Sequence, residues 1–102
     1  MWYFYLAYFI AGLFLVNGVP HFVNGISGRK FQSPFASPSG VGESSAVVNV
    51  IWGLINFAIG FVLIRFVGDF HYDFEFNVIM VFLGALVTAI GLAWYFAKVR
   101  KS

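Results

Sequence analysis

The first 28 residues, MWYFYLAYFIAGLFLVNGVPHFVNGISG (residues 1–28), contain no charged side chain when His21 is counted as neutral. Residues 44–64 and 76–97 are likewise free of charge. Each run has about the 20 residues that a helix needs to cross a hydrocarbon core roughly 30 Å thick. The pattern therefore predicts an all-α integral membrane protein. Its three transmembrane helices are expected at about 2–22, 45–66 and 76–97.

The composition agrees with this class of protein. Charged residues make up 10% of the chain, against roughly 25% in an average soluble domain. Three spans, a long loop at 23–44, a short loop at 67–75 and a basic tail at 98–102 use the whole sequence, so a single transmembrane domain is expected. The first apolar segment lacks a basic leading region and is too long for a signal peptide. Cysteine is absent, which excludes disulfides, thiol catalysis and cysteine metal sites.

Charge predicts the orientation in the cell membrane. The 23–44 loop carries Arg29 and Lys30, and the 98–102 tail carries three further cations, whereas the 67–75 loop carries three carboxylates. Cationic segments favour the cytoplasmic side of a membrane. We therefore expect the N-terminus outside, the long loop and the C-terminus inside, and a multi-pass protein of the cytoplasmic membrane.

Polar residues interrupt the first span near its predicted inner end. Asn17, His21 and Asn24 follow one helical face, and Pro20 lies among them. A proline removes one backbone hydrogen bond and clashes with the preceding turn. Unpaired backbone groups are tolerated in a membrane only where protein or water satisfies them. The sequence thus predicts that the first helix breaks up here and that its polar groups line a pocket.

The second and third spans carry matching polar or small stripes. Asn49, Gly53, Asn56 and Gly60 share one face of the second span, with Trp52 beside them. The stripes have two interpretations: packing seams, or the lining of a cytoplasm-facing pocket. The residues assigned to helix packing are Gly53, Gly60, Gly84, Thr88 and Gly91. The residues assigned to ligand binding are Asn17, His21, Asn24, Arg29, Lys30, Asn49, Trp52 and Asn56, with Arg29 or Lys30 at the mouth.

Both loops leave alternatives open. The 23–44 loop is either a flexible linker or a segment that folds back through Phe31 and Phe35, and Ser44 or Ser45 is a candidate cap for the second helix. The 67–75 loop alternates acidic and aromatic residues, as in a strand or a chain lying at the membrane interface. A divalent cation bound by His71 and the carboxylates is the less favoured reading because no motif fixes their spacing. We therefore expect no metal site.

No catalytic constellation or phosphate-binding motif is found, so the chain is expected not to be an enzyme, to need no cofactor and to bind no nucleic acid. The first hypothesis is a homo-oligomeric protein of the lipid bilayer that binds or transports a small polar or anionic solute. The alternative is an accessory or scaffolding subunit that docks another membrane protein. A transporter needs several copies because three helices cannot enclose a solute path.

Overall fold

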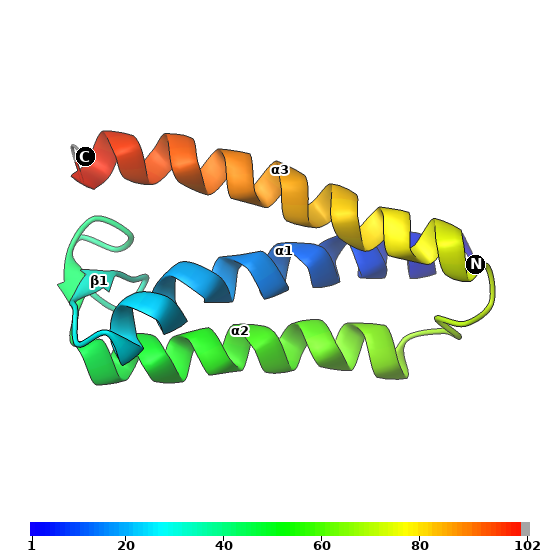
Figure 1. Cartoon of the computed structure of the whole chain (residues 1–102), viewed down its shortest axis with the longest axis horizontal. Helices are drawn as coiled ribbons and strands as arrows, with labels where there is room; N and C mark the ends of the chain where they lie inside the picture. Colours follow the sequence, from blue (N-terminus) through cyan, green and yellow to red (C-terminus); the bar gives the residue numbers. More distant parts are fainter. Residues whose placement is uncertain (101–102) are drawn as a thin grey trace.

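The computed structural model describes residues 1–100, so Lys101 of the predicted basic tail lies outside the described residues. Its elements are three helices, α1 (Trp2–Ile26), α2 (Ala46–Phe66) and α3 (Phe74–Arg100), and an antiparallel pair of short strands, β1 (Phe31–Gln32) and β2 (Glu43–Ser44) (Figure 1). All three helices are long and apolar enough to cross a membrane, in agreement with the predicted multi-pass membrane class. The molecule is 41 Å long, which exceeds a hydrocarbon core of roughly 30 Å.

Helix α1 lies between α2 and α3 and packs against both (Figure 1). Glycines set these contacts, because association inside lipid depends on close approach of helix backbones. A side chain at Gly12 or Gly84 would overlap a backbone carbonyl of the facing helix, and Gly18 and Gly53 meet each other's backbones across α1 and α2. Gly60 packs against Leu15.

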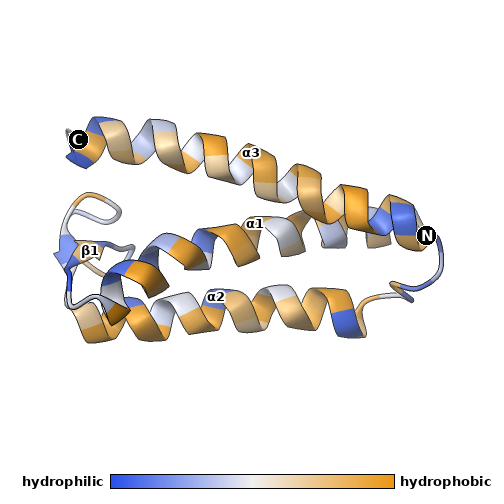
Figure 2. Cartoon of the chain, in the orientation of Figure 1, coloured by the Kyte–Doolittle hydropathy of each residue, from blue (hydrophilic) through white to orange (hydrophobic). Residues whose placement is uncertain are grey.

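The five residues predicted to pack between helices differ in how deeply they are buried. Gly53, Gly60 and Gly84 are buried between helices, as expected. Thr88 is half-buried, whereas Gly91 is exposed with open space around it. Because Gly84 is used inside the chain, it is not free to contact a second copy. The outward faces of the helices are mostly apolar, and hydrophilic residues gather toward the ends of the molecule (Figure 2).

The predicted break in the first helix is wrong. Helix α1 continues through Pro20 to Ile26. It ends where Gly28, at φ 76°, donates its N–H to the carbonyl of Gly25, and Arg29 donates to the carbonyl of Asn24. This is the Schellman arrangement, which satisfies the last carbonyls of a helix and favours glycine at the left-handed position. Gly28, rather than Pro20, is therefore the residue that ends α1.

The other helix boundaries lie close to those predicted. Ser45 caps α2 by accepting a hydrogen bond from Val48 N at 3.2 Å, which confirms one of the two candidate caps. Helix α3 begins at Phe74 and reaches Arg100, so most of the predicted tail is its last turn. Two features explain the early start of α3: Asn77 N donates to the carbonyl of Asp73, and Glu75 places a negative charge in the first turn.

The expectation of one long loop over 23–44 is not supported. Residues 23–26 belong to α1, and β1 and β2 pair Phe31 with Ser44 and Gln32 with Glu43. We call residues 31–44 the hairpin. It folds back between the C-terminal end of α3 and the other two helices, with Phe31 as its buried anchor (Figure 1).

The acidic segment after α2 forms turns rather than a strand. Tyr72 N donates to the carbonyl of Asp69, and Asp73 adopts a positive φ of 59° just before α3 begins. Within residues 1–100, no group of three histidine or carboxylate side chains is placed to hold a metal ion. The alternation of acidic and aromatic residues here therefore reflects a turn and a helix start.

Candidate functional site

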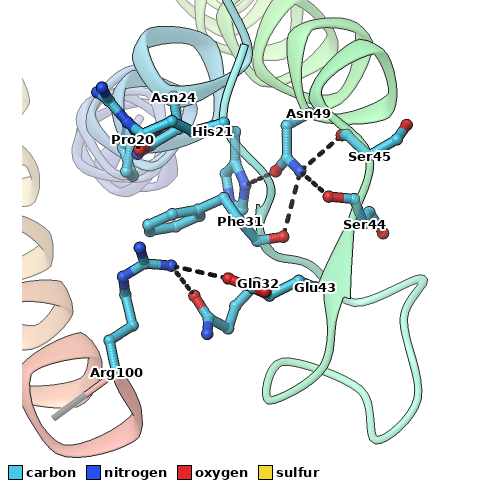
Figure 3. A network of polar contacts seen from close by, with 11 residues as sticks. Pro20, His21, Asn24, Phe31, Gln32, Glu43, Ser44, Ser45, Asn49 and Arg100 are labelled. Carbon is cyan, nitrogen blue, oxygen red and sulfur yellow. Dashed lines mark hydrogen bonds and ion pairs between the residues drawn. The ribbon is translucent and has the colours of Figure 1, made fainter. Parts of the chain in front are cut away.

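A buried polar pair lies where the hairpin covers the ends of α1 and α2. His21 on α1 and Asn49 on α2 are joined by a 2.7 Å hydrogen bond between Nδ1 and Oδ1 (Figure 3). His21 is 4% exposed and Asn49 is 0% exposed. The amide nitrogen of Asn49 also lies within hydrogen-bond distance of the carbonyls of Phe31, Ser44 and Ser45, at 3.2, 3.1 and 3.0 Å. Asn49 thus ties both strands of the hairpin to the transmembrane helices.

These bonds determine the tautomer of His21. The amide hydrogens of Asn49 point to backbone carbonyls, so its Oδ1 faces the imidazole as an acceptor. Nδ1 of His21 must then carry the hydrogen of the neutral ring, and Nε2 is an acceptor. No other hydrogen bond of this imidazole occurs within the described chain, so Nε2 is left to contact something else.

A second polar pair lies further into the helix bundle. Asn17 Nδ2 donates to Asn56 Oδ1 at 2.9 Å, and Asn56 Nδ2 donates to the carbonyl of Trp52 at 2.8 Å. Asn56 is fully buried. The pair satisfies polar groups that would be costly in hydrocarbon and joins α1 to α2 at the same time.

A cavity of about 180 Å³ lies beside these pairs, between the hairpin and the three helices. Its lining residues are Asn17, His21, Gln32, Ser33, Pro34, Gly40, Trp52, Leu92, Tyr95 and Phe96. Trp52 Nε1 is buried and has no hydrogen-bond partner within residues 1–100. Tyr95 donates its hydroxyl to the carbonyl of Gly40 at 2.8 Å, which holds the hairpin against α3.

The structure separates the predicted binding residues into three groups. Asn17, His21 and Trp52 line the cavity, whereas Asn49 and Asn56 are the buried partners of two of them. The remaining three residues, Asn24, Arg29 and Lys30, do not line it. Arg29 donates through Nε to Asn24 Oδ1 at 3.0 Å, and Asn24 donates to the carbonyl of Pro20, so these side chains serve the end of α1.

Sequence reasoning missed the contribution of α3 to this site. Arg100 Nη1 donates to Gln32 Oε1 at 2.6 Å and lies 3.4 Å from Glu43 Oε2, and its guanidinium stacks 4.6 Å from the Phe31 ring centre (Figure 3). The Phe31 ring also packs against Phe96 at 4.7 Å. Arg100 was expected to be a basic residue of a free tail, and no local pattern could have linked it to residues so distant in sequence.

No family model, no curated protein and no solved structure matches this chain. The chemistry of the site therefore follows from its own groups. The polar atoms of its lining residues that have no hydrogen-bond partner within residues 1–100 include the acceptor His21 Nε2 and the donor Trp52 Nε1, and none of the lining residues is a lysine, arginine, aspartate or glutamate. This arrangement suits an uncharged molecule that can both accept and donate hydrogen bonds.

Proposed function

We propose that this chain is a multi-pass membrane protein that binds a compact polar solute in the cavity beneath the hairpin. The observation that carries the proposal is Trp52 Nε1, a buried donor that has no partner within residues 1–100 and belongs to a residue lining that cavity. Leaving such a group unpaired costs about 1–3 kcal/mol. A solute that accepts a hydrogen bond from Trp52 and donates one to His21 Nε2 would remove this cost. The proposal assigns the chain no enzymatic step.

The size and charge of the cavity narrow the class of solute. Ligand pockets for drug-sized molecules measure roughly 300–1,000 Å³. This one measures about 180 Å³, so a solute of few non-hydrogen atoms is favoured. The sequence pointed to a polar or anionic solute because of Arg29 and Lys30. Since neither residue lines the cavity, the geometry favours an uncharged solute over an anion.

The proposed orientation places this cavity on the cytoplasmic side of the cell membrane. Arg29, Lys30, Lys98 and Arg100 all lie at the end of the molecule that carries the hairpin, and cations favour the cytoplasm. Cysteines introduced by Ser37→Cys and Tyr72→Cys test this cleanly, because the chain has no cysteine of its own. In intact cells an impermeant thiol reagent should label the Tyr72→Cys variant and spare the Ser37→Cys variant. The reverse pattern would invert the orientation.

Transport is the extension of this proposal, and it requires a homo-oligomer. Close backbone contacts at Gly12, Gly53 and Gly60 fill the middle of a single chain, which argues against a solute path through one copy. The exposed face of α3 around Gly91 is the surface that we assign to a second copy.

The second candidate function is an accessory subunit of a larger membrane complex. Its support is that Asn17, Asn49 and Asn56 find their partners inside the chain, as residues of a packing seam would. In that case the exposed face of α3 would contact another membrane protein. The access of small polar molecules to Trp52 distinguishes the two candidate functions, because a binding cavity must admit such molecules.

We expect acrylamide, a small uncharged amide, to quench the fluorescence of Trp52. The test uses the Trp2→Phe, Trp94→Phe double variant, in which Trp52 is the one tryptophan left. Acrylamide can accept from Trp52 and donate to His21, whereas iodide, a hydrated anion, should quench far less. Leu92→Phe, which enlarges a lining residue, should reduce quenching at least about twofold, as expected when cavity space is filled.

The matched control is Leu86→Phe, the same change at an exposed position of α3. It should leave acrylamide quenching unchanged. Quenching of Trp52 by brominated lipid but not by acrylamide would show that the indole faces hydrocarbon. That result would remove the binding proposal and favour the accessory subunit.

A further inference from the structure

A second cavity, of about 270 Å³, lies at the opposite end of the molecule. It lies between the start of α1, the turn after α2 and the start of α3. Its lining residues are Met1, Phe4, Tyr5, Tyr8, Asp69, Tyr72 and Asn77. We call it the aromatic cavity, because four of these residues carry aromatic rings.

Asn77, one of the residues that line this cavity, carries an unsatisfied acceptor. The side chain is 1% exposed, and its amide nitrogen donates to the carbonyls of Phe70 and Tyr72 at 2.8 and 2.6 Å. Both amide hydrogens are therefore used. The remaining atom, Oδ1, is buried and has no partner within residues 1–100. Buried acceptors in folded proteins are normally paired, so this oxygen points to a missing donor.

The two inner tyrosines have also used their donors. Tyr5 donates its hydroxyl to Asp73 Oδ2 at 3.1 Å, and Tyr8 donates to the carbonyl of Val67 at 2.7 Å. Each hydroxyl has one hydrogen, so only oxygen lone pairs and ring surfaces remain for an occupant. Tyr72, whose hydroxyl makes no hydrogen bond within residues 1–100, is 78% exposed and stands at the edge.

The charged side chain that lines the aromatic cavity is Asp69, whereas the positive amino group of the lining belongs to Met1, a residue that is 76% exposed. Asp69 Oδ1 accepts from His71 N at 3.0 Å, and its second oxygen has no partner among the described residues. Arg65, the nearby cation of α2, lies over the Phe66 ring and lines a neighbouring hollow instead. No ion pair joins the Met1 amino group to Asp69 within residues 1–100.

We propose that the aromatic cavity binds a small organic ammonium ion. The occupant must donate hydrogen bonds or carry positive charge, because the inner wall offers acceptors, a carboxylate and aromatic rings. Electron-rich ring faces attract cations, and clusters of such rings recognise substituted ammonium groups. A volume near the lower limit of ligand pockets fits an ion of the size of choline. This inference is independent of the solute proposed for the cavity beneath the hairpin.

Choline binding to the purified protein in a maltoside detergent, measured by calorimetry, tests the proposal. The uncharged choline analogue 3,3-dimethyl-1-butanol has nearly the same shape and should bind at least about tenfold more weakly, because it lacks the charge that rings and carboxylate attract. Equal affinity for choline and the analogue, or no saturable choline binding, would overturn the proposal. This comparison does not depend on the folding of any variant.

Asp69→Asn provides the test within the chain. It removes the charge but keeps an oxygen that can accept from His71 N, and it should weaken choline binding at least about tenfold. Glu75→Gln is the matched control, since Glu75 lies at the same end of the molecule, in the first turn of α3, but does not line the aromatic cavity. It should change affinity much less. Equal losses in the two variants would count against a site at Asp69.

The same cation could come from solution or from a lipid headgroup. Nanodiscs of phosphatidylglycerol, with and without phosphatidylcholine, separate the two sources. If the site holds the lipid headgroup, phosphatidylcholine should compete with added choline and weaken its apparent affinity. If the site takes a free cation, the affinity for choline should be the same in both membranes. Either result supports an ammonium site, whereas failure to bind choline in both membranes excludes it.

Discussion

Replacing Gly84 by alanine should destabilise the fold much more than replacing Gly91 by alanine, although both glycines lie in α3 and the chemical change is identical. A Cβ atom at Gly84 would overlap the carbonyl oxygen of Phe9 on α1, whereas a Cβ atom at Gly91 meets nothing within 4 Å. A backbone carbonyl within a helix cannot rotate aside as a side chain can. The Gly84→Ala variant must therefore separate α1 from α3.

Separation would affect the whole contact between these helices. Gly12 on α1 approaches the backbone of Val81 and Ala85, so the neighbouring turn loses its packing as well. Overpacking of a well-packed interior typically costs about 1–3 kcal/mol, and occasionally more. We expect a loss of about 3 kcal/mol in the free energy of unfolding for Gly84→Ala.

Unfolding by sodium dodecyl sulfate from mixed micelles, followed by near-ultraviolet circular dichroism, measures this difference. Gly91→Ala should stay within about 0.5 kcal/mol of the unaltered protein, as is usual for surface substitutions. If both variants lose the same free energy, the α1–α3 contact at Gly84 is not as close as the structure has it.

The positions of the spans could be predicted from sequence because the membrane imposes a simple physical rule. A helix crossing hydrocarbon needs about 20 apolar residues, and runs without charge mark where such helices can lie. The rule does not locate helix ends. Pro20 predicts a break in the first helix near residue 22, but its ring is compatible with helical φ, and α1 continues to Ile26. The stop comes from Gly28, whose left-handed conformation closes the last turn.

The part of the candidate site that lies between α1 and α2 could also be predicted, because helical spacing is a simple rule that the sequence reveals. Asn17 and Asn56 each belong to a polar or small stripe with helical spacing on its own span, so the two stripes could be expected to face each other, and the structure joins the two residues. The contacts of the hairpin could not be found in this way. Arg100 reaches Gln32 across 68 positions of the chain, and no periodicity connects a strand residue to the last turn of a helix.

Sequence alone also could not separate glycines that look equivalent. Gly84 and Gly91 are seven residues apart in α3 and were assigned the same packing role. The structure buries one against α1 and exposes the other, because α3 diverges from α1 toward the C-terminus (Figure 1). Which glycine is covered depends on the angle between the helices, and that angle is a property of all their contacts together.

Replacing Asn49 by leucine, a side chain of similar size, should release the hairpin from the helices. The change removes the acceptor of His21 Nδ1–H and the donor to the carbonyls of Phe31 and Ser44. A typical hydrogen bond contributes about 1 kcal/mol net, and those within membrane proteins average about 0.6 kcal/mol. Three lost contacts thus predict a loss of about 2–3 kcal/mol in the free energy of unfolding.

A local measurement shows where this loss falls. Hydrogen exchange of the backbone amides in residues 31–44 should become much faster in Asn49→Leu, because exchange reports the free energy of local opening. Exchange in the middle of α1 and α2 should change less, since the glycine contacts there remain.

Asn24→Leu is the matched control, the same substitution near the same end of the molecule. Asn24 bonds to Pro20 on its own helix and to Arg29, and it makes no hydrogen bond to the hairpin. Exchange in residues 31–44 should therefore be unaltered in this variant. If Asn49→Leu leaves the hairpin as protected as Asn24→Leu does, the hairpin is held by Phe31, Tyr95 and Arg100 without Asn49, and the buried pair of His21 and Asn49 serves only to join α1 and α2.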